Sequence, residues 1–177
     1  DSHMHYHGAD GVYASVNENG LLKLFWGESK VYGDPTAAIR DCLSSLAPFL
    51  VETDHEGADR ERDLVLLSDK ADLSDPELTA AFRKYFDRTS PLSNRVEYCG
   101  IALIAFDADF YPKDDAKGIG EDILKAANDE MEKWVKNVKN RLSVEKLDKF
   151  DIQFFCVPVP SADVFRASFL EALGIKK

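Results

Sequence analysis

An Asn-Gly pair at positions 19 and 20 constrains the fold of this chain more than any other feature. It separates two segments with strand-like patterns, residues 10–16 and 21–31, and Asn-Gly suits the tight turn of a β-hairpin. A hairpin brings the start of its first strand beside the end of its second. We therefore expect Asp10 to lie near Glu28 and Lys30, which share one face because strand side chains alternate.

The segment after the hairpin has the markers of an α-helix. Asp34 is a suitable N-cap, and Pro35 suits the first helical position. Apolar residues then recur with a period near 3.6 up to about residue 51. These residues are Ala38, Cys42, Leu46 and Phe49. Their spacing predicts a helix with one buried face.

The rest of the chain alternates between helical and extended patterns, which predicts an α/β fold with a mixed sheet flanked by helices. Further helices are predicted at residues 60–70, 76–86, 120–142 and 161–173, and further strands at residues 96–106 and 150–157. In the longest helix, the side chains predicted to face inward are Ile123, Ala127, Met131, Trp134, Val135 and Val138.

Composition limits the classes of function. The 177 residues carry a net charge of −10, which argues against a stand-alone, tight, non-specific binder of DNA, because phosphate contacts need lysine and arginine. No apolar run approaches the roughly 18–20 residues of a membrane span. The three cysteines form no Cys-x-x-Cys pair, so we expect reduced core thiols in a cytoplasmic protein rather than a zinc site.

Two carboxylates that meet at the end of a hairpin repel each other unless a cation lies between them. Mg²⁺ or Mn²⁺ suits such oxygen ligands, and the backbone carbonyl of Ser29 is a third candidate ligand beside Asp10 and Glu28. Lys30 could position an attacking water or neutralise charge on phosphorus. The alternative is a surface ion pair at a strand end and an unrelated aspartate in a turn.

Two short segments resemble a known group of nucleases. His7-Gly8-Ala9-Asp10, followed by Trp26-Gly27-Glu28-Ser29-Lys30-Val31-Tyr32, is similar to the PD-(D/E)xK restriction-endonuclease-like superfamily. More narrowly, the chain resembles HamA, the nuclease subunit of the bacterial Hachiman anti-phage system. The resemblance implies a DNA endonuclease that works with a helicase subunit. It also implies metal binding by Asp10 and Glu28 and a catalytic role for Lys30.

The first residues of the chain resemble what remains of a cleaved expression tag, and the domain that follows lacks an expected N-terminal part. Ser2-His3-Met4 resembles the scar of a cleaved tag, so residues 1–4 are set aside and residues 5–177 are taken as one domain. The superfamily core has a helix and a strand before the first acid. We therefore expect the C-terminal part of a longer protein, whose isolated activity is in doubt. His7 is a possible accessory group for phosphate contact or proton transfer.

One basic segment on the longest predicted helix is a candidate for contact with DNA. Lys133, Lys136, Lys139 and Arg141 follow one another without an intervening acidic residue. The alternative is a solvated helix face. For the whole chain, a non-catalytic module that docks a helicase partner is the alternative to a nuclease, and the chemistry alone does not separate DNA from RNA as the substrate.

Overall fold

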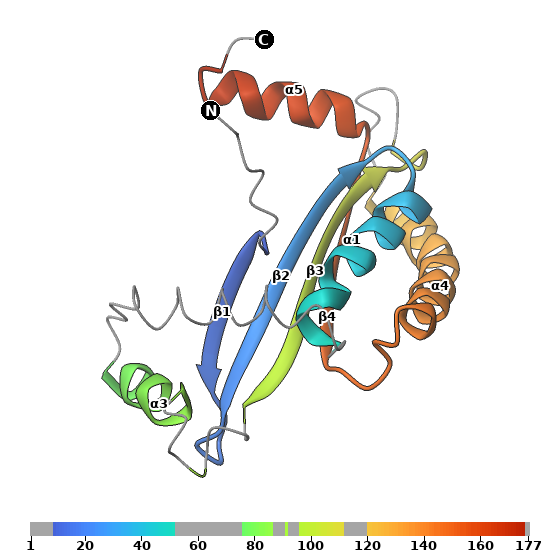
Figure 1. Cartoon of the computed structure of the whole chain (residues 1–177). Helices are drawn as coiled ribbons and strands as arrows, with labels where there is room; N and C mark the ends of the chain where they lie inside the picture. The colour runs from blue at the N-terminus through green and yellow to red at the C-terminus, as the bar shows by residue number, and fades with distance from the viewer. Residues whose placement is uncertain (1–8, 52–75, 87–90, 92–95, 112–119, 176–177) are drawn as a thin grey trace, which may run out of the picture. The chain divides into compact units, whose positions relative to one another are not determined.

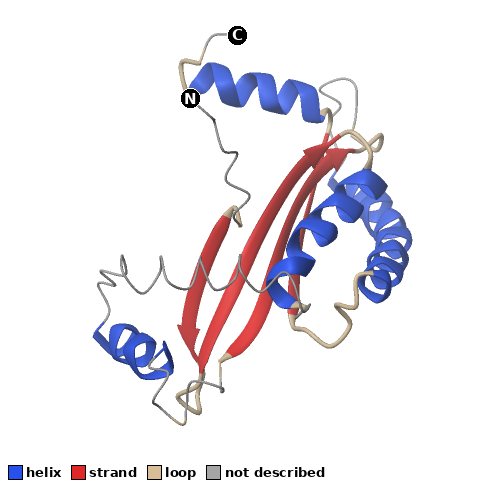
Figure 2. Cartoon of the chain, viewed as in Figure 1, coloured by secondary structure: helices blue, strands red, loops and turns tan. Residues whose placement is uncertain are grey.

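The computed structural model describes residues 9–51, 76–86, 91, 96–111 and 120–175. It confirms an α/β fold with a mixed sheet flanked by helices (Figures 1 and 2). In chain order the elements are β1 (Gly11–Val16), β2 (Leu22–Tyr32), α1 (Pro35–Leu50), α3 (Pro76–Phe86), β3 (Glu97–Asp107), α4 (Gly120–Val144), β4 (Ile152–Val159) and α5 (Ala162–Ala172). The helix predicted at residues 60–70 lies outside the described residues.

The four strands lie in the order β1-β2-β3-β4. β1 and β2 form the predicted antiparallel hairpin, and Figure 1 shows β2 and β3 with their arrowheads at the same end. β4 is parallel to β3. The evidence is that Gly100 N donates to the carbonyl of Asp151 and Ala108 N donates to the carbonyl of Val159, so the partner number rises along both strands.

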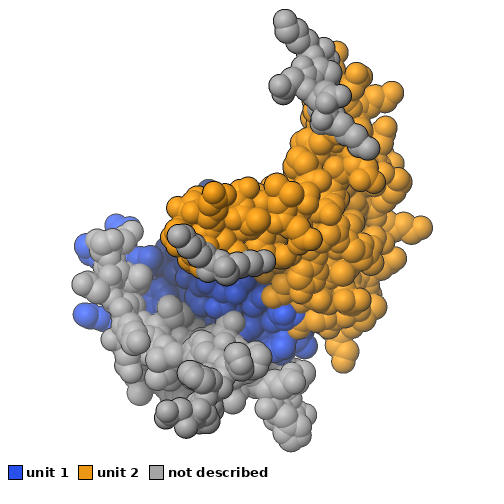
Figure 3. All heavy atoms as spheres, turned by 90° about the horizontal axis from the view of Figure 1, so that it is seen from above, with its two compact units in different colours: residues 1–28, 45–101, 149–153 blue, residues 29–44, 102–148, 154–177 orange. Residues whose placement is uncertain are grey.

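The chain divides into two compact units (Figure 3). Unit 1 comprises residues 1–28, 45–101 and 149–153, and unit 2 comprises residues 29–44, 102–148 and 154–177. The division passes through β2 directly after Glu28. The candidate carboxylates Asp10 and Glu28 therefore belong to unit 1, whereas Lys30 belongs to unit 2.

The core of unit 1 is built on one face of β2. Leu22, Leu24 and Trp26 alternate along the strand and are completely buried. The indole of Trp26 stacks on Phe49 of α1 at 6.4 Å between ring centroids and contacts Tyr98 of β3 at 5.5 Å. The apolar stripe predicted for α1 is confirmed, since all four of its members are buried. The second strand of the hairpin, β2, thus carries a buried face that is lined by aromatic rings.

In unit 2, α4 packs through a narrower face than its sequence predicts. Trp134 is buried and meets Phe106 of β3 edge to face, at 4.5 Å between ring centroids. Met131 and Val135, which were predicted to face inward, are each 45% exposed, so that part of the prediction is wrong. A 3.6-residue period locates the centre of an apolar face, but its width depends on what the helix meets.

The ends of the other elements follow local chemistry. Gly20 has φ +73°, as the Asn-Gly turn requires, and its carbonyl accepts a hydrogen bond from the hydroxyl of Tyr85 at 2.8 Å. Ser161 caps α5 by accepting from Val164 N, and Gly174 follows with φ +71°. β4 continues through Pro158 to Val159, two residues past its predicted end. It is the last strand in the order, where proline's missing N–H is tolerated.

Asp34 caps α1, and we expect this contact to contribute to the free energy of unfolding. Its two carboxylate oxygens accept from Thr36 N at 3.1 Å and Ala37 N at 3.0 Å. Asp34→Ala leaves these N–H groups without their cap and should lower the free energy of unfolding by about 1 kcal/mol, measured by urea denaturation. Asp34→Ser, which keeps an acceptor, should retain most of the stability. Equal losses in both variants would contradict a capping role.

Candidate functional site

The β1–β2 hairpin directs Asp10 and Glu28 to the same end of the ladder. The observed register pairs Val16 with Leu22 at the turn and Gly11 with Gly27 at the far end. One residue beyond that last pair, the same register leads to Asp10 and Glu28. Directly opposed residues in an antiparallel ladder have Cβ atoms about 4.5–5.5 Å apart. Asp10 lies just outside β1, so its pairing with Glu28 stays a prediction that the register favours.

Glu28 extends the buried face of β2. It follows the fully buried row of Leu22, Leu24 and Trp26, and it is itself only 5% exposed. Among the residues that the structure describes, it is the only charged side chain in the core. A carboxylate removed from water is costly unless hydrogen bonds or a cation compensate it. Glu28 has an interaction partner within the fold, and its burial places this candidate ligand at the buried end of the apolar row of β2.

Ser29 and Lys30 continue β2 within unit 2. Ser29 is exposed, and Lys30 is half-buried. The hydrogen bond from Arg40 holds the pKa of Asp41 below its usual value, and the charge of Lys30 acts more weakly in the same direction, which places Lys30 near α1. The position of Lys30 relative to Asp10 and Glu28 remains a prediction from strand alternation. The accessory candidate His7 lies outside the described residues.

The basic segment of α4 is only partly available for an external ligand. Lys133 forms an i,i+3 ion pair with Glu130. Arg141 forms an i,i+4 ion pair with Glu145, and its guanidinium also donates to the hydroxyl of Ser44. Lys136 and Lys139 are exposed. A role in contacting DNA therefore rests more on these two lysines than on the two residues that are engaged within the fold.

Unit 2 also contains an acidic cavity of about 740 Å³. The carboxylates in its lining are Asp34, Asp107, Asp109, Asp129 and Glu130. Three of them have structural partners: Asp34 caps α1, Asp107 accepts from Ala162 N at the start of α5, and Glu130 pairs with Lys133. These contacts explain much of the acidic lining without a ligand.

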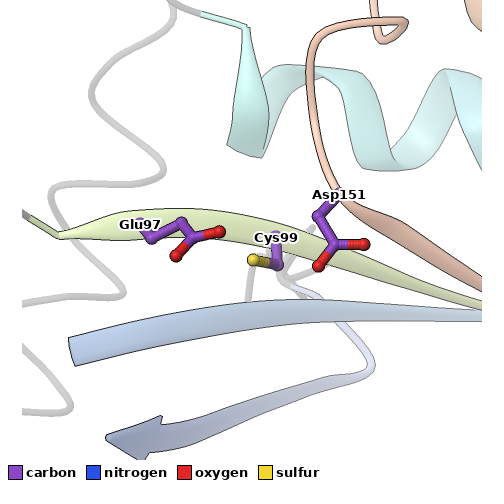
Figure 4. A group of neighbouring side chains, drawn as sticks. All are labelled: Glu97, Cys99 and Asp151. Carbon is purple, nitrogen blue, oxygen red and sulfur yellow. The ribbon is translucent and has the colours of Figure 1, made fainter. Parts of the chain in front are cut away.

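A second group of ligand-type side chains lies in unit 1, beside Lys23 of β2. Glu97, Cys99 and Asp151 have potential metal-ligating atoms that all lie within 4.8 Å of one another, and the three residues could hold a metal ion (Figure 4). Lys23 Nζ lies 2.9 Å from Glu97 Oε1 and 3.8 Å from Asp151 Oδ2. The hydrogen bond to Glu97 raises the pKa of Lys23, and burial raises the pKa of the Cys99 thiol to about 11.

Sequence reasoning missed this group because its members are distant along the chain. Glu97 and Cys99 are two residues apart on β3, so alternation alone places them on one face. Asp151 joins them only through the pairing of β3 with the residues that lead into β4, seen in the hydrogen bond from Gly100 N to its carbonyl. Cys42 and Cys99 are buried and Cys156 is half-buried, and none of the three forms a disulfide.

The sequence profile of the HamA family matches residues 1–173. No curated protein and no solved structure matches the chain. Among the described residues, no helix is both long and apolar enough to cross a lipid bilayer. The profile covers nearly the whole sequence, and the chain therefore belongs to the HamA family, which relates it to Hachiman defence.

Proposed function

We propose that this chain carries a metal-dependent endonuclease site that cuts phosphodiester bonds of DNA in anti-phage defence. The observation that carries the proposal is the buried carboxylate of Glu28, with Asp10 one register step beyond the last pair of the hairpin. Membership of the HamA family supports the link to defence. The resemblance to PD-(D/E)xK nucleases supplies the reaction class.

The donor set fits a hard divalent cation. Asp10, Glu28 and the carbonyl of Ser29 offer oxygen ligands, which Mg²⁺ and Mn²⁺ prefer. Such an ion, when bound, supplies an activated water and stabilises negative charge on a phosphate. The burial of Glu28 fits this assignment, since a low-dielectric position strengthens the attraction between a carboxylate and a cation.

The other residues of the proposed site act on the substrate. Lys30 is a cation on the same strand and would orient the attacking water or neutralise charge on the reacting phosphate. Lys136 and Lys139 are exposed on α4 and would attract the DNA backbone. With a net charge of −10, the chain needs further positive charge for tight DNA binding, and a helicase subunit is the partner we propose to supply it.

A second candidate role is a non-catalytic module that docks the helicase subunit. The net charge of −10 favours it, and so does α5, whose large apolar side chains are mostly exposed. The exposed side chains on this helix and its C-cap are Val164, Phe165, Phe169 and Leu173. An 11-residue helix gains little stability by itself in water, so cover by a partner would stabilise it. The two roles differ in whether the protein cuts DNA.

A cleavage assay separates the two roles. The full chain is incubated with supercoiled plasmid and Mg²⁺ or Mn²⁺, with and without the helicase subunit, and in parallel with RNA. We expect cutting by the wild type and a loss of about 100-fold in rate for Lys30→Met, because the charge at the reacting phosphate is removed.

Lys125→Met is the matched control, since Lys125 is exposed on α4 and is assigned no role at the site. It should cut at the wild-type rate. Equal rates for Lys30→Met and the wild type would refute the role of Lys30. Absence of any cleavage, even with the helicase subunit and either metal, would favour the docking role instead.

A further inference from the structure

The group formed by Glu97, Cys99 and Asp151 is separate from the proposed nuclease site. Lys23, which lies beside this group, is on β2 like Glu28. The two are an odd number of residues apart, and side chains alternate along a strand, so Lys23 points to the other face of the sheet. Five residues of strand separate the two, or roughly 16 Å at about 3.3 Å per residue. All members of the group lie in unit 1, so the distances between them are distances within one compact unit.

The geometry suits a small cation. The ligand atoms of the three residues lie within 4.8 Å of one another, whereas ligand atoms around one tetrahedral zinc ion are about 3.5 Å apart. Shifts of about 1 Å in the side chains would therefore close the group around an ion. The side chains of Glu97 and Asp151 are 42% and 52% exposed, which leaves a route for an ion from solvent.

The buried sulfur is the feature that points to a ligand. Cys99 is completely buried, and it forms no disulfide. Figure 4 shows the sulfur beside the carboxyl groups of Glu97 and Asp151. A structural cysteine that serves only to fill space gains nothing from two neighbouring carboxylates.

Among the described residues, the two carboxylates of the group are paired with one ammonium group, that of Lys23, which is close to Glu97 but lies 3.8 Å from Asp151. A divalent ion in the place of this ammonium group would neutralise both acids, and the thiolate that binds it carries one further negative charge. A thiolate ligand favours zinc over magnesium, calcium or manganese, which prefer oxygen alone.

We propose that Glu97, Cys99 and Asp151 form a binding site for Zn²⁺, and that the Lys23 ammonium occupies this place when no ion is bound. On binding, the Cys99 thiol loses its proton to solvent, a sulfur–zinc bond forms and Lys23 moves away from the acids. Water completes the coordination. The ion joins β3 to the residues that lead into β4, so binding stabilises unit 1.

Cobalt substitution tests this site in the full chain. Co²⁺ added to the wild type should produce a near-ultraviolet sulfur-to-cobalt charge-transfer band, which Zn²⁺ then abolishes. Cys99→Ser should lose the band, whereas Cys42→Ser and Cys156→Ser should keep it. Cobalt bound to histidines near the N-terminus gives no sulfur band, so those residues do not confuse the result. Circular dichroism confirms that each variant is folded.

Lys23→Met supplies a result that a merely structural ion pair would not give. Removing the competing ammonium should tighten cobalt binding about fivefold, the size expected when a surface ion pair no longer competes. Glu28→Gln should leave the band unchanged, so failure of the nuclease proposal would not affect this one. Absence of the band in the wild type, its survival in Cys99→Ser, or its appearance only in Lys23→Met would overturn the proposal.

Discussion

Glu28→Gln should remove metal-dependent DNA cleavage, with a loss of at least about 100-fold, while the protein remains folded. The substitution keeps the size of the side chain but removes the negative charge that would hold the cation. Glu28 is only 5% exposed and has an interaction partner within the fold, so removing its charge also weakens that interaction. We therefore expect a thermal midpoint below that of the wild type, with the protein still folded at the assay temperature.

Glu18→Gln is the matched control. Glu18 is exposed in the turn at the opposite end of the same hairpin, so its replacement changes the net charge by the same amount. It should leave both cleavage and the thermal midpoint unchanged. A plasmid-nicking time course and a thermal melt of each variant give both readouts. A Glu28→Gln protein that cuts at the wild-type rate would show that the metal-binding assignment of this residue is wrong.

Trp26→Ala should have the largest effect on stability, a loss of about 3–5 kcal/mol in the free energy of unfolding. Trp26 is completely buried between Phe49 and Tyr98, and the smaller side chain leaves a cavity in unit 1. Urea denaturation at equilibrium measures the loss. Because Trp26 shares a face with Glu28, cleavage by the folded fraction should fall as well.

Trp26→Phe tests the origin of that loss. Among the described residues, Trp26 Nε1 is a buried donor without a hydrogen-bond partner, and phenylalanine removes it while keeping an aromatic ring in the core. We expect a cost below about 1.5 kcal/mol. A phenylalanine variant as unstable as the alanine variant would indicate that the indole N–H has a partner that matters.

The local elements were predictable because their signals are local. Asn19-Gly20 defines the hairpin and its register, and Asp34-Pro35 defines the start of α1. All four residues of the stripe predicted for α1 are buried, although Ile39, Leu43 and Leu50 of the same helix are buried as well. The exposure of Met131 and Val135 of α4 was not predicted. It depends on how much of the helix surface is covered, and the period of the apolar residues does not show this.

The two groups of candidate metal ligands also differ in whether local sequence signals bring their residues together. Asp10 and Glu28 are linked by the register of one hairpin, so the sequence alone suggests that they meet. The burial of Glu28 was not predictable, because it depends on what packs against β2, whereas Asp10 is exposed. Glu97, Cys99 and Asp151 come together through parallel pairing of segments about 50 residues apart, which leaves no local sequence signal.

The central claim, that Asp10 and Glu28 together hold one divalent cation, is tested most directly by titration with Mn²⁺ followed by electron paramagnetic resonance. Free Mn²⁺ gives a six-line signal that decreases as the ion binds. We predict a site in the wild type and in Cys99→Ser that is lost in both Asp10→Asn and Glu28→Gln. Equal Mn²⁺ binding in the wild type and in both carboxylate variants would contradict the account.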